Sequence, residues 1–214
     1  MEFYPAFIRL AGRRAVVVGG GAVAERKALT LLEAGADVAV VSPGLTPGLG
    51  KLAEAGRIAH VKRDYRAGDL KDAAVAVAAT DDPETNLEAA REAGTLGILF
   101  NCASPPGAGN FIVPSSIERG GLTVAISTGG TCPALSKKLR IEIESFLGRE
   151  YGPLLAFLDE ARALIKERVP DQARRAEILS ALVESDAAEL FKTKDAETAK
   201  KEAMERLEGL VKGV

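Results

Sequence analysis

The stretch that decides the fold reads Ala15-Val16-Val17-Val18-Gly19-Gly20-Gly21-Ala22-Val23-Ala24. Four consecutive apolar residues predict a short buried strand, three glycines close it, and apolar residues at helical spacing follow as far as Ala34. The pattern Gly19-x-Gly21-x-x-Ala24 therefore lies between a strand and a helix, which is the context that a dinucleotide-binding fingerprint requires. Glycines permit a tight turn and close approach of a pyrophosphate, whose charge the free N–H groups of the helix start favour. A glycine-rich turn without any ligand is the alternative interpretation.

The alternation of strands and helices continues on the C-terminal side. Residues 38–41 form a second apolar strand, so that strand, glycine turn, helix and strand make a βαβ unit. Further elements are predicted at 46–55 (helix), 58–61 (strand), 74–79 (strand), 83–93 (helix, with Asp82 as its N-cap) and 97–101 (strand). This alternation is typical of an α/β fold and predicts a Rossmann-like, doubly wound parallel sheet over residues 1–112.

The pattern changes after residue 110. Residues 111–114 and 122–127 have β character, and a helix is predicted from residue 133 to about 147. Together they make a small α+β segment over residues 113–147. Because such short β segments do not make an independent sheet, we expect this segment to mediate dimerisation.

The remaining residues, 148–214, have a helical pattern throughout and are predicted to form a helical C-terminal domain. Residues 192–214 mix both signs of charge with few large apolar side chains. We therefore expect a solvated or frayed helix at the end of the chain.

The composition excludes several classes of protein. The 214 residues carry a net charge of -2, so no overall field attracts nucleic acid or an anionic membrane. No apolar run approaches the roughly 18–20 residues of a membrane-spanning helix, and residues 1–5 lack the features of a signal peptide. Two cysteines and one histidine argue against a disulfide scaffold or a conventional zinc site. We expect a cytoplasmic protein that binds no nucleic acid, membrane or metal and works through a cofactor.

One element of the dinucleotide fingerprint is missing. An acid that bonds the ribose hydroxyls usually follows the second strand, but this position carries Ser42-Pro43-Gly44, and Asp37 lies at the start of the strand. The backbone of residues 43–44 or the Ser42 hydroxyl would then contact the ribose. No arginine follows the strand to pair with a 2′-phosphate, which favours NAD over NADP.

Five stretches of the chain resemble one known family, in order and in spacing, and the resemblance extends over residues 3–147. The stretches are Tyr4-Pro5-Ala6-Phe7, Val18–Lys27, Ala78–Asp82, Asn110–Ser115 and Ile126–Leu135. They resemble the precorrin-2 dehydrogenases, which include the N-terminal module of sirohaem synthases. The resemblance implies a Rossmann domain, a central dimerisation segment, a helical tail and a homodimer. It also implies NAD-dependent oxidation of precorrin-2 to sirohydrochlorin, and some members of the family insert ferrous iron as well.

The expected cofactor contacts follow from the fingerprint and the resemblance together. The family contacts NAD at positions that match Ala22-Val23 and Pro43-Gly44, which agrees with the pyrophosphate and ribose positions expected above. Thr80-Asp81 end a strand at the carboxyl edge, where ligands bind in such sheets. The expected cofactor-binding residues are Gly19, Gly21, Ala22, Val23, Ser42, Pro43, Gly44, Thr80 and Asp81.

The expected substrate carries many carboxylates and therefore requires local cations and exposed helix starts. The stretch Gly129–Leu135 supplies a helix N-terminus, where backbone donors and the helix dipole favour an anion. Basic residues lie on or near the same element, and solvation of a helix face is their alternative role. The expected substrate-binding residues are Asn110, Arg119, Thr128, Gly129, Gly130, Thr131 and Lys137.

The chain departs from the family at Ser104. Some members have an aspartate with a catalytic role in the segment that matches Asn101–Pro106, and Ser104 stands in its place as the candidate catalytic residue. Serine is not an effective general base near neutral pH without an activating partner. We expect dehydrogenation to survive, because hydride transfer depends mainly on holding the cofactor against the substrate, whereas iron insertion loses its candidate proton acceptor. A bifunctional dehydrogenase and ferrochelatase, and an NAD(H)-sensing module without turnover, stay open as alternatives.

Overall fold

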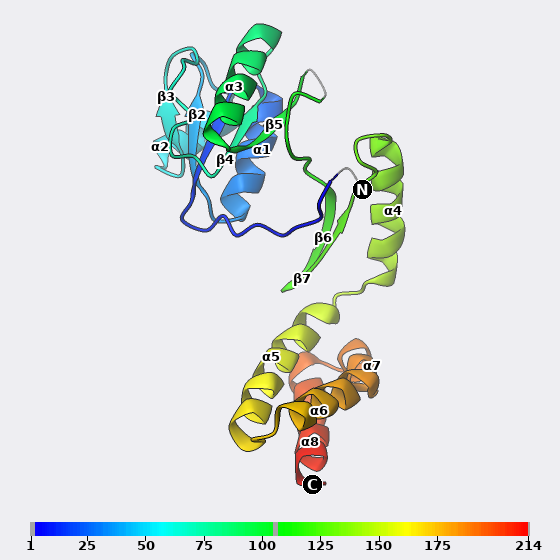
Figure 1. Cartoon of the computed structure of the whole chain (residues 1–214). Coiled ribbons are helices and arrows are strands. Elements are labelled where there is room, and N and C mark those ends of the chain that lie inside the picture. Colours follow the sequence, from blue (N-terminus) through cyan, green and yellow to red (C-terminus); the bar gives the residue numbers. More distant parts are fainter. Residues whose placement is uncertain (1–2, 105–106, 214) are drawn as a thin grey trace. The chain divides into compact units, whose positions relative to one another are not determined.

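The computed structural model describes residues 3–104 and 107–213 (Figure 1). The chain divides into two compact units, Met1–Val113 and Pro114–Val214, which are called the N-terminal unit and the C-terminal unit below. Each unit has a hydrophobic core of its own. The division after Val113 falls where the sequence pattern changes from alternating strands and helices to a different order.

The N-terminal unit is a five-stranded parallel sheet with the strand order β3-β2-β1-β4-β5. The strands are β1 (Arg14–Val18), β2 (Asp37–Val41), β3 (Ala59–Val61), β4 (Val75–Ala78) and β5 (Leu99–Cys102). The helices are α1 (Ala22–Glu33), α2 (Pro47–Glu54) and α3 (Pro83–Leu96). The predicted Rossmann-like parallel sheet is therefore confirmed.

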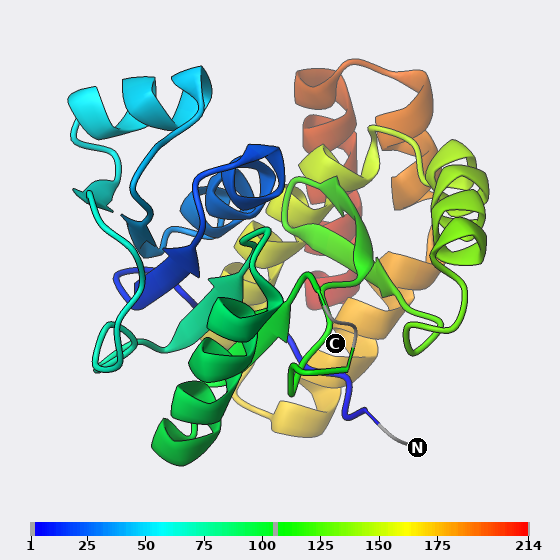
Figure 2. The same ribbon diagram turned by 90° about the horizontal axis from the view of Figure 1, so that it is seen from above.

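Apolar side chains of the central strand alternate between the two faces of the sheet. Ala15 and Val17 of β1 pack with α1 and α2, whereas Val16 and Val18 pack with α3 on the other face. Figure 2 shows α1 (blue) and α3 (green) on opposite sides of the sheet. Burial on both faces explains why the central strands are continuous apolar runs and not alternating ones.

Helix α3 begins as the sequence predicts and continues slightly further. The Asp82 side chain accepts hydrogen bonds from the N–H groups of Glu84 and Thr85, at 3.1 and 3.3 Å, which confirms its role as an N-cap. The helix ends at Leu96, because Gly97 adopts a left-handed conformation with φ +67°.

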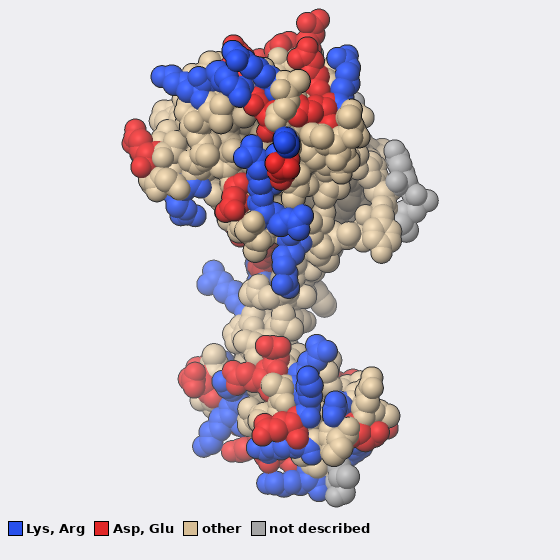
Figure 3. Space-filling view, turned by 60° about the vertical axis from the view of Figure 1, so that its left-hand side comes forward, with Lys and Arg blue, Asp and Glu red and all other residues tan. Residues whose placement is uncertain are grey.

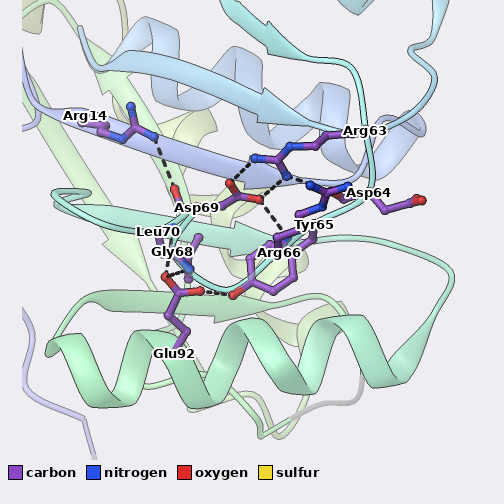
Figure 4. A network of polar contacts seen from close by, with 9 residues as sticks. All are labelled: Arg14, Arg63, Asp64, Tyr65, Arg66, Gly68, Asp69, Leu70 and Glu92. Atoms are coloured by element: carbon purple, nitrogen blue, oxygen red, sulfur yellow. Dashed lines mark hydrogen bonds and ion pairs between the residues drawn. The ribbon is translucent and has the colours of Figure 1, made fainter.

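Residues 62–74, which connect β3 to β4, cross the sheet as turns where a helix usually makes such a connection. Asp69 organises the first part of this crossover (Figure 4). The Arg63 guanidinium donates two hydrogen bonds to the Asp69 carboxylate, at 2.6 and 2.7 Å, and the Arg66 N–H donates a third at 2.8 Å. This segment has no helical hydrogen bonds to hold it, and the Asp69 carboxylate closes the turn in their place.

Glu92 of α3 holds the second part of the crossover against the sheet. Its carboxylate accepts hydrogen bonds from the N–H groups of Gly68 and Leu70, at 3.0 and 3.2 Å, and from the Tyr65 hydroxyl (Figure 4). The Leu70 side chain is fully buried among β1, β4 and α3. Leu70 therefore covers the apolar patch of the sheet that a crossover helix would otherwise cover.

The C-terminal unit contains a hairpin and five helices among its described residues. Strands β6 (Ser115–Arg119) and β7 (Leu122–Ile126) pair antiparallel, and helix α4 (Pro133–Phe146) packs against them. Four more helices enclose a separate core that includes Phe157, Leu182 and Leu207. They are α5 (Tyr151–Arg168), α6 (Gln172–Glu184), α7 (Ala187–Thr193) and α8 (Ala196–Lys212).

Two predictions for the chain after residue 110 are wrong. Residues 111–114 do not form a strand; the strand is Ser115–Arg119, because Pro114 has no N–H to donate and pairing begins only after it. The expected solvated helix at the chain end is instead packed: Ala199, Ala203 and Leu207 of α8 are almost completely buried. Alanines four residues apart let α8 approach its neighbours closely, so burial here does not require large apolar side chains.

Asp69→Asn tests the role of the carboxylate in the crossover. The hydrogen bonds from Arg63 hold the pKa of Asp69 below its ordinary value. Such a group stabilises the fold above its unfolded pKa of about 4, and that stabilisation is lost as pH falls through the folded pKa. We expect the variant to lose about 1–2 kcal/mol of unfolding free energy at pH 7, and the difference from the wild type to shrink on acidification.

Urea unfolding at pH 7, 5 and 3 measures this difference. Asp64→Asn is the control, because Asp64 is an exposed acid in the same loop. A deficit of Asp69→Asn that stays constant over this pH range would contradict a contribution from the ionised carboxylate.

Candidate functional site

The predicted cofactor residues follow three strands of the N-terminal unit, and the candidate catalytic residue Ser104 follows a fourth. Residues 19–21 follow β1, residues 42–44 follow β2, residues 80–81 follow β4 and Ser104 follows β5. Because the strands are parallel, all these loops lie at the carboxyl edge of one sheet. The strand order reverses between β1 and β4, and ligands of open α/β sheets bind in the crevice at such a reversal.

Two glycines of the β1–α1 turn are required by the fold, independently of any ligand. Gly19 has φ +118°, and a Cβ there would lie 2.5 Å from the Ala79 carbonyl oxygen. A Cβ on Gly20 would lie 1.9 Å from the carbonyl oxygen of Gly44 and 2.6 Å from the Ser42 hydroxyl. The backbones that follow β1, β2 and β4 therefore touch, and a side chain at either glycine would separate them.

Gly21 is different, because nothing in the fold requires a glycine there. Its φ of -83° and ψ of -175° suit any residue, and a Cβ would meet no described atom within 4 Å. Gly21 caps α1, and its carbonyl accepts the first intrahelical hydrogen bond, from the Glu25 N–H at 2.9 Å. The N–H groups of Ala22, Val23 and Ala24 precede that bond and point out of the helix start. Open space beside unused donors fits a pyrophosphate.

The loop after β2 offers a ligand its backbone and no free polar side chain. Ser42 is buried and its hydroxyl donates to the Gly44 carbonyl at 2.7 Å, while His60 Nε2 of β3 lies 2.9 Å from the Ser42 carbonyl oxygen. Pro43 and Gly44 are exposed. Of the two expected ribose contacts, the backbone of residues 43–44 is therefore the accessible one, and the Ser42 hydroxyl is already engaged.

Sequence reasoning missed Asn86, which connects the loops after β4 and β5. Asn86 lies in the first turn of α3 and is completely buried. Its amide bonds to Thr80 and to the Ser104 carbonyl, while Asp81 and Ser104 are themselves exposed. Asn86, Ala89 and Ala93 share the buried face of α3, so an amide at an otherwise apolar position was the available indication. Pro105 and Pro106, which follow Ser104, lie outside the described residues.

The C-terminal unit contains a second turn with exposed backbone, formed by residues 128–131. Gly129 and Gly130 have φ values of +63° and +84°. The Thr128 hydroxyl accepts from the Cys132 N–H at 3.1 Å and lies 3.2 Å from the Ser136 hydroxyl. Gly129, Gly130 and Thr131 are exposed, and α4 begins directly afterwards.

Four basic residues near this turn differ in their partners. Lys137 is exposed, whereas Lys138 pairs with Glu142 at 3.6 Å and Arg140 pairs with Glu144. Arg119, from β6, donates to the Leu147 carbonyl at 3.2 Å and to Glu144 at 3.2 Å, and so holds the end of α4. On the face shown in Figure 3, basic and acidic side chains are interspersed over both units. Recognition of an anion would therefore depend on local groups.

Asn110, another predicted substrate contact, holds strand β5 in place. Its side-chain oxygen accepts from the Phe100 N–H at 2.7 Å, and its amide nitrogen donates to the Ile98 carbonyl at 2.8 Å. These bonds use one donor and one acceptor of the amide. A substrate role for Asn110 remains a prediction.

The described residues contain neither a cluster of metal ligands nor a helix suited to a membrane. No group of three histidine, cysteine, aspartate or glutamate side chains is placed to hold a metal ion. None of the described helices combines the length and the apolarity that crossing a membrane demands.

The parallel sheet, with its glycine turn at the strand reversal, defines a Rossmann-type nucleotide-binding protein. Family comparison agrees, since a putative NAD(P)-binding family matches residues 6–115. The families described as sirohaem biosynthesis protein central and sirohaem synthase dimerisation region match residues 119–145 and 150–207. The chain therefore belongs to the putative NAD(P)-binding family, and its remaining residues match two families of sirohaem biosynthesis proteins. The dimerisation match covers α5–α7 and most of α8, whereas the sequence pattern placed dimerisation in residues 113–147.

Individual relatives agree with this assignment. The chain is 39% identical to a siroheme synthase of Chromobacterium violaceum over 97% of its own length and 44% of that protein. It is 44% identical to a siroheme synthase of Methylobacillus flagellatus over 78% of its length and 36% of that protein. Its fold matches the solved structure of SirC, a precorrin-2 dehydrogenase, with a TM-score of 0.77 and 27% identity, over 97% of this chain and 100% of that one. The chain thus spans less than half of these siroheme synthases.

Gly21→Ala and Gly20→Ala are a matched pair that separates folding from cofactor binding. We expect Gly21→Ala to change the unfolding free energy by less than about 1 kcal/mol, because its Cβ meets only open space. The same methyl group would intrude on a pyrophosphate, so NADH affinity should fall about tenfold or more. Gly20→Ala should destabilise the fold by about 2 kcal/mol or more, because its Cβ would overlap the Gly44 carbonyl.

Urea unfolding and titration of NADH fluorescence give the two quantities. Unchanged NADH affinity in Gly21→Ala would support the alternative of a glycine-rich turn without a ligand.

Proposed function

We propose that this chain is a precorrin-2 dehydrogenase that oxidises precorrin-2 to sirohydrochlorin with NAD. The observation that carries the proposal is the Gly21 turn, where open space and unused N–H donors face the strand reversal. The match to SirC over the full length of that chain supports the reaction assigned. Bound NAD⁺ supplies a hydride acceptor, and the second hydrogen leaves the substrate as a proton. The protein's part is to hold the nicotinamide against the reacting carbon.

The loop after β2 supports NAD over NADP. Pro43 and Gly44 are exposed at the position where a dinucleotide-binding domain usually contacts the ribose. Neither residue carries a cation for a 2′-phosphate. The backbone of this loop, held by the buried Ser42, supplies the proposed ribose contact.

The substrate side of the proposal rests on the turn at residues 128–131. Exposed backbone before the start of α4 favours carboxylate groups, and Lys137 in the second turn of that helix adds an exposed cation. Ser104 is exposed at the carboxyl edge, where its hydroxyl can contact substrate without acting as a general base. For this reason we place dehydrogenation ahead of the bifunctional alternative with iron insertion.

We also propose that the chain acts as a homodimer. Helix α4 exposes Ile141 and Phe146, the latter with 83% of its surface accessible. Exposed large apolar side chains on one element indicate an interaction surface. The match of residues 150–207 to a sirohaem synthase dimerisation region supports a second copy of this chain as the partner.

An anaerobic assay of the purified protein with precorrin-2 tests the function. We expect NADH and sirohydrochlorin to form in equal amounts with NAD, at a higher kcat/KM than with NADP, and no iron-dependent product when ferrous iron is added. Sirohaem formation would establish the bifunctional alternative. NADH binding without any turnover would refute the dehydrogenase and favour the NAD(H)-sensing module.

Lys137→Glu tests the substrate surface, with Lys138→Glu as the matched control. Both lysines are exposed neighbours on α4, but Lys138 is already paired with Glu142. We expect Lys137→Glu to raise the KM for precorrin-2 about tenfold or more, which corresponds to about 1.4 kcal/mol, and Lys138→Glu to raise it less. Equal KM values in the two variants would assign Lys137 to the solvated face of the helix.

A further inference from the structure

We propose that Asn86 is a positioning residue for hydride transfer: it fixes the Ser104 loop at a set place beside the Thr80 loop. The proposal rests on the dehydrogenase function proposed above. It assigns a role to a residue that is fully buried and that the cofactor and substrate contacts do not include.

The two loops that Asn86 joins belong to the second half of the sheet. A Rossmann sheet binds a dinucleotide across its strand reversal, with one nucleotide half over each group of strands. Here β3, β2 and β1 make up one group, and β4 and β5 make up the other. The glycine fingerprint is the expected pyrophosphate contact at β1, so the nicotinamide half would lie over the loops that follow β4 and β5. Residues 79–82 and 103–104 are those loops.

Every atom of the Asn86 amide that can form a hydrogen bond is directed at these loops. Its oxygen lies 3.2 Å from the Thr80 N–H nitrogen and 2.8 Å from the Thr80 hydroxyl. Its nitrogen donates to the Thr80 carbonyl at 3.0 Å and to the Ser104 carbonyl at 2.8 Å. The Ser104 carbonyl lies 3.1 Å from the Cys102 thiol as well, so its backbone is fixed although the residue is exposed.

Packing alone does not account for this amide. Ala89 and Ala93 continue the same buried face of α3 with small apolar side chains, and packing alone would accept an apolar residue at position 86. Burying an amide is unfavourable unless its hydrogen bonds are satisfied. Asn86 satisfies them with two loops that are 24 residues apart in the chain, at positions 80 and 104, and so sets their separation.

Asn86→Asp is the test, because it keeps the size of the side chain and the acceptor oxygen but removes both donated hydrogen bonds. We expect the kcat for precorrin-2 oxidation, per NADH-binding site, to fall by about 10- to 100-fold, since small misplacements of reacting groups have effects of this size. The Kd for NADH should change by less than about threefold, because the pyrophosphate turn is untouched. If Asn86→Asp does not fold, Asn86→Ser, which keeps one hydroxyl donor, is measured instead.

Glu92→Gln is the matched control. Glu92 lies on the same helix and also holds a loop, at residues 65–70, by accepting backbone hydrogen bonds. Its variant should be destabilised while keeping wild-type kcat per binding site. Equal kcat losses in Glu92→Gln and Asn86→Asp would assign Asn86 to general stability and overturn the proposal.

A double-mutant cycle with Ser104→Ala gives a second readout. Ser104→Ala keeps the carbonyl that Asn86 bonds but removes the hydroxyl. If Asn86 acts by positioning that hydroxyl, the two substitutions are non-additive, and Asn86→Asp lowers kcat less in the Ser104→Ala background than in the wild type. Additive effects would overturn the proposal. A wild-type protein without turnover would instead refute the dehydrogenase function itself, so the two failures are distinguishable.

Discussion

The architecture depends on the contact of three backbones at the glycine turn. The loop after β1 touches the loops after β2 and β4, and Gly19 and Gly20 make that approach possible because neither has a Cβ. The contact brings the carboxyl ends of the three central strands together. It leaves the next position, Gly21, facing open space at the start of a helix. Two glycines thus serve the fold, and the third is the one proposed to serve cofactor binding.

Helix α3 has a comparable division of roles along its length. Near its start, Asn86 connects loops at the carboxyl edge of the sheet, and near its end Glu92 holds the crossover between β3 and β4. Both side chains bond mainly to backbone groups of other segments. The polar side chains of α3 therefore hold loops near both ends of the helix. Its apolar side chains pack the helix against the sheet.

Much of this arrangement is predictable from the sequence, and the exceptions have physical reasons. Apolar runs predict the strands of the parallel sheet, because strands buried on both faces are apolar throughout. The Asp82 cap predicts the start of α3, because capping involves residues that are close together in the chain. The packing of α8 was missed because alanines bury little area and give a weak apolar pattern. Asn86 was missed because one of its two partners, Ser104, is brought beside it by the topology of the sheet, through β5, and not by the order of the chain. Contacts between segments that are distant in the chain also decide which residues touch a ligand, and the sequence pattern does not reveal such contacts.

The crossover without a helix affects the ribose side of the site as well. Strand β3 has three residues, lies at the edge of the sheet and is followed by turns that side-chain carboxylates close. Short edge elements open locally more readily than central strands. His60 of β3 bonds to the Ser42 carbonyl, so each opening of this edge would also release the loop proposed to contact the ribose. Cofactor binding and the stability of this edge are therefore thermodynamically linked, and a bound dinucleotide would slow hydrogen exchange in this short edge strand.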